Sequence, residues 1–265
     1  MLKYLVTEHK LIWTLAKNDF KTKFAGSYLG IVWALVQPIV TVLVYWFVFQ
    51  VGLRQTADFN GCPFVLWMLA GLVPWFYFQE AMVGGTNVLM EYSYLVKKVV
   101  FKIEILPMIK MISALFIHLF FVCVAVALFC INGKFSGPYA LQVIYYSFCM
   151  FALALGLCYV TSAVAVFFRD LLQIVNIILQ VGVWATPIMW NLTDPGLGLP
   201  NLLVMVFKLN PMYYIVYGYR DALVYKVWFW EHPGLTLYFW AFTIIMFLLG
   251  SRIFKRLRVH FADVL

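Results

Sequence analysis

The sequence predicts an all-α polytopic membrane protein with six transmembrane helices, an N-terminal amphipathic interfacial helix, and an outer-side re-entrant helical segment between spans five and six. Three observations predict this fold class. Hydrophobic residues make up 65% of the chain and charged residues only 11%, whereas about 25% of the residues of soluble globular domains are charged. Long uncharged runs recur along the chain. Basic residues cluster beside the ends of these runs.

These runs take up most of the 265 residues, so the chain is expected to form one membrane domain without a soluble catalytic domain. Its expected parts are an amphipathic helix over 1–28, spans one to five over 29–190, a re-entrant segment over 191–234, and span six with a basic tail over 235–265. The net charge of +8 lies beside span ends, where lipid headgroups and topology signals account for it, so nucleic-acid binding is not expected.

The first predicted element is an amphipathic helix over Leu2–Phe24. At about 100° per residue its apolar side chains share one face, with lysines along one border and Glu8 and Asp19 along the other. Lys23 alone breaks this pattern. A helix of this kind lies in the plane of a membrane surface. The sequence leaves a plain anchor and a gating or partner-contacting role equally open.

The spans are expected at Leu29–Val51, Phe64–Leu89, Met108–Ile131, Tyr139–Phe168, Leu171–Trp190 and Leu235–Gly250. Pro38 is expected to kink span one, and Gly71, Pro74 and the Gly84–Gly85 pair are expected to interrupt span two.

One acidic residue and one histidine fall inside the spans. Glu80 in span two has no obvious partner in neighbouring spans, so we expect it to face another helix or water rather than to relay protons. His118 in span three has no second histidine or cysteine nearby, which favours a hydrogen-bonded packing residue over a ligand.

The segment Leu202–Tyr225 is apolar but carries Lys208, an Asn210–Pro211 break, Arg220 and Asp221. Each charge at mid-bilayer costs about 2.5 to 3.5 kcal/mol. We therefore expect a helical pair that enters from the outer side and is buried in protein or lines a watery cavity.

The basic residues set the orientation. Most of the 19 Lys and Arg residues fall in the N-terminal helix, the inner connections and the tail, and those assigned to the outer side are Arg54, Lys134, Lys208, Arg220 and Lys226. An even number of crossings keeps both basic ends on one side, whereas a seventh crossing would place the tail outside. Both termini are therefore expected in the cytoplasm.

The connection Glu91–Pro107 between spans two and three has a dense cluster of bases and apolar residues in alternation. This pattern suits a short helix against the inner face. Its apolar residues must be shielded from water. The sequence favours neither the membrane nor a docked soluble subunit as the surface that covers them.

Catalytic and metal-binding motifs are absent from the sequence. The Gly133–Lys134 pair is followed by Phe135, so it is not a phosphate-binding loop. No HExxH motif, G-x-S-x-G motif or inner-loop acid pair is present, and the five cysteines form no CxxC or Cys/His cluster. We expect a chain that is not an enzyme and holds no nucleotide, cofactor or metal.

A set of short segments carries a resemblance that spans essentially the whole chain: Asn18–Lys21, Tyr28–Gly30 with Trp33 and Gln37–Pro38, Gly71–Leu72 with Pro74–Trp75, Phe167–Asp170, Thr186–Ile188, Leu209–Met212, Tyr219–Asp221 and Phe261–Val264. In this order and spacing they resemble the membrane subunits of ABC-2 type polysaccharide exporters, the O-antigen, capsule and teichoic-acid permeases. One departure is Lys102, which follows Phe101 where the family often has a proline.

The resemblance implies a homodimer in the bacterial cytoplasmic membrane, with two copies of a cytoplasmic ATP-binding subunit that hold ATP and magnesium, and with a lipid-linked polysaccharide as the substrate. It implies that Leu2–Phe24 is an inner gate. The ATPase would dock on the inner connection through Lys97, Lys98, Phe101, Lys102 and Glu104, and the segment Gly196–Tyr225 would form an outer gate that includes Asn210, Pro211, Tyr213, Arg220 and Asp221.

We expect two copies to form a tunnel between spans one and five. Aromatic rings stack on the C–H faces of sugars, and the predicted lining is Trp33, Tyr45, Trp46, Phe49 and Trp184. The lipid headgroup is expected to meet Lys17, Lys21 and Lys23 before it enters. Two alternatives remain: an ABC-2 exporter of a small lipid or drug, and a membrane-embedded glycan-modifying enzyme that uses Glu80 or His118.

Overall fold

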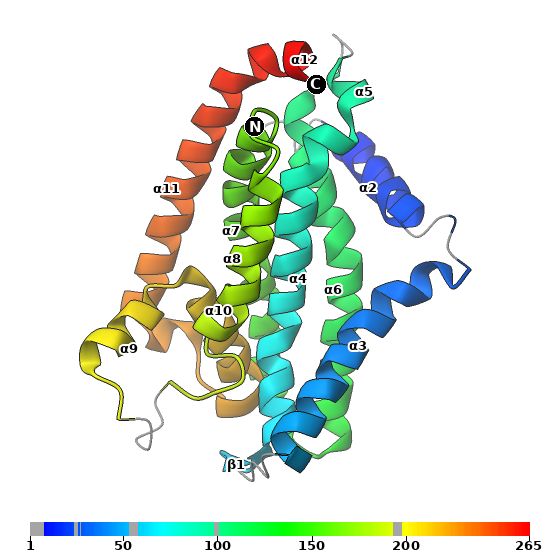
Figure 1. The fold of residues 1–265 in the computed structure, drawn as a ribbon. Helices are drawn as coiled ribbons and strands as arrows, with labels where there is room; N and C mark the ends of the chain where they lie inside the picture. The colour runs from blue at the N-terminus through cyan, green and yellow to red at the C-terminus, as the bar shows by residue number, and fades with distance from the viewer. Residues whose placement is uncertain (1–7, 24–25, 27, 53–57, 98–100, 193–197) are drawn as a thin grey trace.

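The fold is a helical bundle built around α4 (Phe64–Glu91), as Figure 1 shows. It is seen in a computed structural model that describes residues 8–23, 26, 28–52, 58–97, 101–192 and 198–265. Along α4 pack α6 (Leu106–Ile131) and α7 (Gln142–Ala165), and α11 (Pro233–Leu257) packs on α7. Five helical stretches in these ranges are long and apolar enough to cross a membrane, and α8 (Leu171–Ala185) is a shorter apolar helix. The predicted all-α polytopic class is confirmed.

The central helix α4 is the most buried of the long helices, with 78% of its most apolar window inside the protein. It is continuous, so the interruptions predicted at Gly71, Pro74 and Gly84–Gly85 are wrong. Two of these glycines instead admit neighbouring side chains. A Cβ on Gly85 would lie 2.4 Å from the sulfur of Cys158, and one on Gly71 would lie 3.1 Å from the guanidinium of Arg220.

The pair α7 and α11 is held close by glycine as well. A Cβ on Gly250 would lie 2.6 Å from the backbone oxygen of Gly156. Without a strong hydrophobic force between helices in lipid, small residues of this kind stabilise the pair by letting the backbones approach.

Span one stands at the edge of the bundle. It consists of a 3-10 turn (Gly30–Val32), α3 (Trp33–Trp46) with Pro38 inside it, and a π-helical end (Phe47–Gly52). None of its most apolar window is buried. The span therefore presents a long apolar surface that lipid or another protein chain covers.

The end of the bundle that is predicted to face outward contains short connecting elements. A hairpin of β1 (Asp58–Phe59) and β2 (Cys62–Pro63) leads into α4, and Asn60 and Gly61 both have positive φ in its turn. Two further described connections are 3-10 segments at Gly137–Leu141 and Phe229–Glu231.

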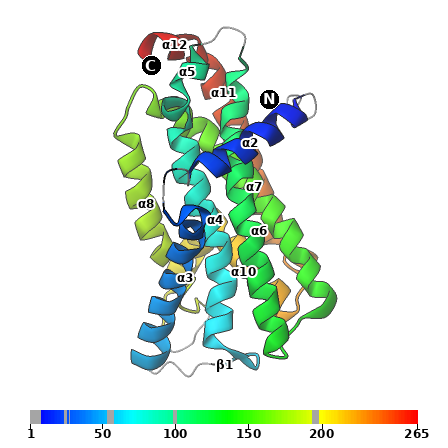
Figure 2. The same ribbon diagram turned by 90° about the vertical axis from the view of Figure 1, so that its right-hand side faces the viewer.

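The elements at the two ends of the described chain lie at the same end of the bundle (Figures 1 and 2). These are α2 (His9–Lys23) and, after a 3-10 turn at Arg258–His260, α12 (Phe261–Val264). The inner connection lies at this end too and contains α5 (Ser93–Val96) and a 3-10 turn at Ile103–Ile105. An even number of crossings would give this arrangement, but the number of crossings and the cytoplasmic placement of this end both stay predictions.

The fifth apolar run is helical over fewer residues than predicted. The sequence analysis placed the span at Leu171–Trp190, but α8 ends at Ala185. Thr186 is extended, with φ −91° and ψ 122°, because a residue before proline avoids the helical region. Backbone carbonyls at Pro187 and Ile188 are therefore left without helical partners inside the protein.

The next segment forms the predicted helical pair, α9 (Asn201–Lys208) and α10 (Pro211–Arg220), followed by a π-helical turn at Asp221–Tyr225. Both helices lie in the half of the bundle opposite α2 and α12, between the end of α8 and the start of α11 (Figure 1). That the pair enters the membrane from the outer side stays a prediction, and residues 193–197 lie outside the described chain.

Arg220 joins this segment to the broken end of α8. Its side chain is fully buried and donates hydrogen bonds to the carbonyls of Pro187 (2.7 Å) and Ile188 (2.5 Å). The guanidinium carbon lies 3.4 Å from the centre of the Trp67 ring, a cation–π contact that is strongest when water is excluded. One buried cation thus binds α10 to both α8 and α4.

Replacing Arg220 with methionine should destabilise the protein, because two buried carbonyls lose their donor at a cost of about 1 to 3 kcal/mol each. The measurement is thermal unfolding of the purified protein in detergent. Lys208→Met removes a part-exposed cation from α9 in the same segment and should leave the melting temperature nearly unchanged. Equal melting of the two variants would contradict this role of Arg220.

Candidate functional site

A cavity of about 860 Å³ opens between α3, α4, α6 and α8. Figure 2 shows α3 and α8 on the same face of the bundle. The lining includes the amides Gln37, Gln79, Asn176 and Gln180 and the rings of Trp33, Tyr45, Trp75, Phe76, Tyr77 and Phe121. Amides supply both donors and acceptors, so the cavity pairs flat apolar faces with hydrogen-bonding groups.

Two of the five predicted lining aromatics face this cavity, Trp33 and Tyr45. The other three are not among its lining residues. Trp46 and Trp184 are 38% and 52% exposed on the outside of the chain, and the ring of Phe49 packs 5.7 Å from that of Phe64. The structure therefore divides the predicted lining between an inner wall and an outer surface.

The predicted gate helix α2 packs on α6, in addition to the predicted position in the plane of the membrane surface. Ile12 and Ala16 are buried, and the rings of Trp13 and Phe20 each lie 5.4 Å from that of Phe116. Residues 1–7 and Phe24, which the sequence analysis included in this helix, lie outside the described residues.

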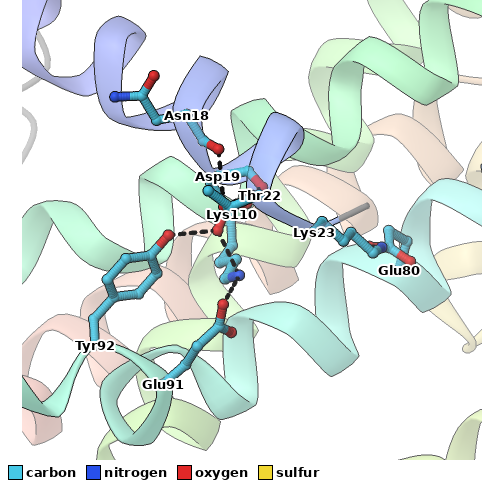
Figure 3. Close-up of polar contacts among 8 residues, drawn as sticks. All are labelled: Asn18, Asp19, Thr22, Lys23, Glu80, Glu91, Tyr92 and Lys110. Atoms are coloured by element: carbon cyan, nitrogen blue, oxygen red, sulfur yellow. Dashed lines mark hydrogen bonds and ion pairs between the residues drawn. The ribbon is translucent and has the colours of Figure 1, made fainter. Parts of the chain in front are cut away.

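Asp19 anchors α2 to the bundle (Figure 3). It is 4% exposed and accepts hydrogen bonds from Lys110 of α6 and from the hydroxyl of Tyr92, both at 2.6 Å. Lys110 also binds Glu91 at 2.8 Å. Burial, followed by the hydrogen bond to Asp19, raises the pKa of Tyr92, so its hydroxyl stays protonated and donates. A buried carboxylate needs partners of this kind.

The three lysines predicted for the lipid headgroup occupy different settings. Lys23 forms an ion pair with Glu80 of α4 (Figure 3) and lines the cavity. Lys17 lies 5.4 Å from the centre of the Trp13 ring, and Lys21 is exposed. The expectation that Glu80 faces another helix or water holds, since its partner comes from α2.

The predicted docking residues are partly exposed and partly used in the fold. Lys97 is exposed and Phe101 is half-buried, while Lys98 lies outside the described residues. Lys102 forms an ion pair with Glu8. Glu104 is buried and forms an ion pair with Arg258 of the C-terminal tail. The tail thus braces the inner connection, which no sequence pattern indicated.

The predicted outer-gate residues are structural within this chain. Asn210 caps α10 by accepting from the backbone N–H of Met212 (3.0 Å) and donates to Thr186 (2.7 Å). Pro211 is the first residue of α10. The ring of Tyr213 stacks 4.2 Å from that of Tyr217. The Asp221 carboxylate lies 3.6 Å from His232.

His118 makes the hydrogen bonds predicted for a packing residue, and it also lies among the residues that line the cavity. Its Nε2 lies within hydrogen-bond distance of the hydroxyls of Tyr219 (2.9 Å) and Ser147 (3.1 Å). Among the described residues no group of three His, Cys, Asp or Glu side chains is placed to hold a metal ion.

Sequence reasoning missed Lys110, which it counted only as a topology signal, and Trp67, which carries no distinguishing motif. The role of Lys110 could have been predicted, because Lys110 and Asp19 carry opposite charges and lie at the same predicted depth.

Comparison with known proteins gives the family. The family model for the ABC-2 type transporter matches residues 10–224, which is most of the chain. The chain is similar to the O-antigen export system permease protein RfbA of Myxococcus xanthus, with 26% identity over 269 residues, covering 99% of this chain and 98% of that protein. RfbA of Klebsiella pneumoniae is 23% identical over 261 residues, covering 96% and 95%. The predicted resemblance is confirmed at this level, and the chain belongs to the ABC-2 type transporter family.

Proposed function

We propose that this chain is the membrane subunit of an ABC exporter that moves a lipid-linked polysaccharide, foremost an O-antigen, outward across the bacterial cytoplasmic membrane. The observation that supports this substrate best is the lining of the cavity, which combines aromatic rings with side-chain amides. Sugar rings stack through their C–H faces on aromatic side chains, and their hydroxyls need polar partners. Two relatives that match nearly the whole chain carry the name O-antigen export permease.

A second copy of the chain completes the path. The exposed apolar surfaces of α3 and α8 flank the cavity, and none of the apolar window of span one is buried. In a homodimer that pairs these surfaces, Trp46 and Trp184 of each copy face the other copy. Trp33 and Tyr45 then form the inner wall of a tunnel.

A separate subunit supplies the energy. The sequence holds no phosphate-binding loop, so two copies of a cytoplasmic ATPase with ATP and magnesium would dock at the inner end of the bundle. Lys97 and Phe101 offer contact there, and the Glu104–Arg258 ion pair holds the segment in place.

The two gates lie at opposite ends of the bundle. Helix α2 would act as the inner gate with Asp19 as its anchor, while α9, α10 and the turn at Asp221–Tyr225 would close the outer end. Lys17, Lys21 and Lys23 would receive the headgroup on the inner side.

Removal of this chain from its cells should make a glycan accumulate inside, and the purified chain should bring with it a subunit that hydrolyses ATP. Immunoblotting of intracellular glycan and ATPase assays of the purified complex test the two statements. Normal surface glycan without this chain would refute the proposal. Glycan modification in membranes that lack any ATPase would favour an enzyme instead.

Replacing Trp33 or Tyr45 with leucine should reduce export about three- to tenfold, the range that corresponds to the loss of an aromatic contact of about 0.5 to 1.5 kcal/mol. Leucine retains apolar volume but removes the flat ring. The measurement is surface glycan per unit of membrane-inserted protein. Phe120→Leu is the matched control, because Phe120 is 42% exposed on α6 and is not among the cavity-lining residues. Full export by both cavity variants would rule out stacking at these positions.

The triple variant with Lys17, Lys21 and Lys23 all changed to glutamine should lose most export, because α2 then retains only Lys10 of its four lysines for the headgroup. Export of surface glycan in cells is the measurement, at a protein level matched by immunoblotting. Undiminished export by this variant would show that these lysines do not receive the headgroup.

A further inference from the structure

The cavity holds one pair of opposite charges. Among the described residues that line it, Lys23 and Glu80 alone carry a formal charge, and they form an ion pair with each other. The pair joins the last residue of α2 to the interior of α4 (Figure 3). The rest of the described wall is apolar, aromatic, amide or hydroxyl, apart from the imidazole of His118.

The pair lies at membrane depth and yet is not buried in protein. Glu80 precedes Glu91, the inner end of α4, by 11 positions, or about 16 Å along a helix that rises 1.5 Å per residue. The side chains of Lys23 and Glu80 are nevertheless 38% and 41% exposed. Charged groups at that depth pair with one another or face a water-filled cavity, and the exposure of this pair fits a cavity that is open to water and to a solute.

The pair is not what attaches α2 to the bundle. That attachment is the ion pair of Asp19 and Lys110, whose side chains are 3% and 11% exposed, together with the Tyr92 hydrogen bond. Exposed ion pairs contribute only about 0 to 1 kcal/mol. The Lys23–Glu80 pair is therefore weak enough to exchange partners while α2 stays anchored.

We propose that Glu80 is a resident counter-ion, which occupies Lys23 until a phosphate group in the cavity takes its place. The proposal rests on the proposed function for the source of that phosphate, the headgroup of a lipid-linked glycan. A phosphate offers more negative charge and more acceptor oxygens than one carboxylate, so it competes well for a single ammonium group. Glu80, released into the wet cavity, repels the phosphate and favours its onward movement.

This exchange makes a prediction that a merely structural ion pair does not. If the pair only stabilises the fold, Glu80→Gln and Lys23→Gln both break it and have the same effect. If Glu80 competes with phosphate, the two variants act in opposite directions. Glu80→Gln removes the carboxylate that competes with phosphate and strengthens phosphate binding, whereas Lys23→Gln removes the binding group.

The experiment measures binding to the full-length chain, in complex with its ATPase subunit, in phosphatidylcholine nanodiscs. The probes are a polyprenyl diphosphate, inorganic pyrophosphate and the uncharged polyprenol, and a further arm adds phosphatidylglycerol as a competing anionic lipid. Asp170→Asn is the matched control, because it removes an exposed acid at the turn before α8 that is not among the cavity-lining residues. Thermal unfolding confirms that each variant is folded.

Glu80→Gln should lower the half-saturating concentration of polyprenyl diphosphate about two- to fivefold, the factor that matches the strength of a part-exposed ion pair. Lys23→Gln should raise it, the double variant should behave like Lys23→Gln, and Asp170→Asn and the polyprenol should show no change. Opposite shifts support the exchange. The arm in which they occur, polyprenyl diphosphate, pyrophosphate or competition by phosphatidylglycerol, identifies the source of the phosphate.

Shifts in the same direction, or none with any probe, overturn the exchange. That failure is distinct from failure of the proposed function, because glycan export in cells is measured separately. Normal glycan export with no shift in binding would refute only the proposed role of Glu80. Opposite shifts in a protein that exports no glycan would support the role of Glu80 and refute the glycan as the substrate.

Discussion

The architecture depends on a backbone that stops being helical inside the protein. Thr186 and Pro187 end α8, and the carbonyls that follow have no water to bind at this depth. Arg220 satisfies two of them and stacks on Trp67, so a residue that is costly in lipid becomes favourable in this position. The position of α10, and with it the half of the bundle that contains α9 and α10, follows from that contact.

In the half of the bundle that contains α2 and α12, buried charged groups are also satisfied by partners from the protein, here by other side chains. Asp19 is buried because Lys110 and Tyr92 satisfy it, and Glu104 is buried beside Arg258 and also receives the Tyr159 hydroxyl on its backbone oxygen. The carboxylates of Asp19 and Glu104 are thus sealed inside, whereas the carboxylate of Glu80 remains open to the cavity. This difference in exposure separates the two acids that hold the fold from the acid that is available to a solute.

Sequence reasoning predicted the order of the helices, the helical pair broken at Asn210–Pro211 and the packing role of His118, because apolar runs and prolines act locally. It placed the end of α8 five residues late, since it read Leu171–Trp190 by hydropathy and ignored Pro187. It also noted Lys23 as a break in an amphipathic pattern without seeing that the break serves Glu80. Ion pairs between residues that are far apart in the sequence, such as Glu104 and Arg258, could not be predicted, because they produce no periodic pattern in the sequence.

Span one is not buried in its most apolar part, and this affects how wide a molecule the cavity can admit. Trp33 and Tyr45 form one wall from a helix that the core hardly fixes, while the opposite walls belong to the tightly packed α4 and α6. The bore is therefore a property of how α3 is seated against its surroundings, not of the fold of one chain. A rigid scaffold with one adjustable side admits solutes of different girth without any change in its core.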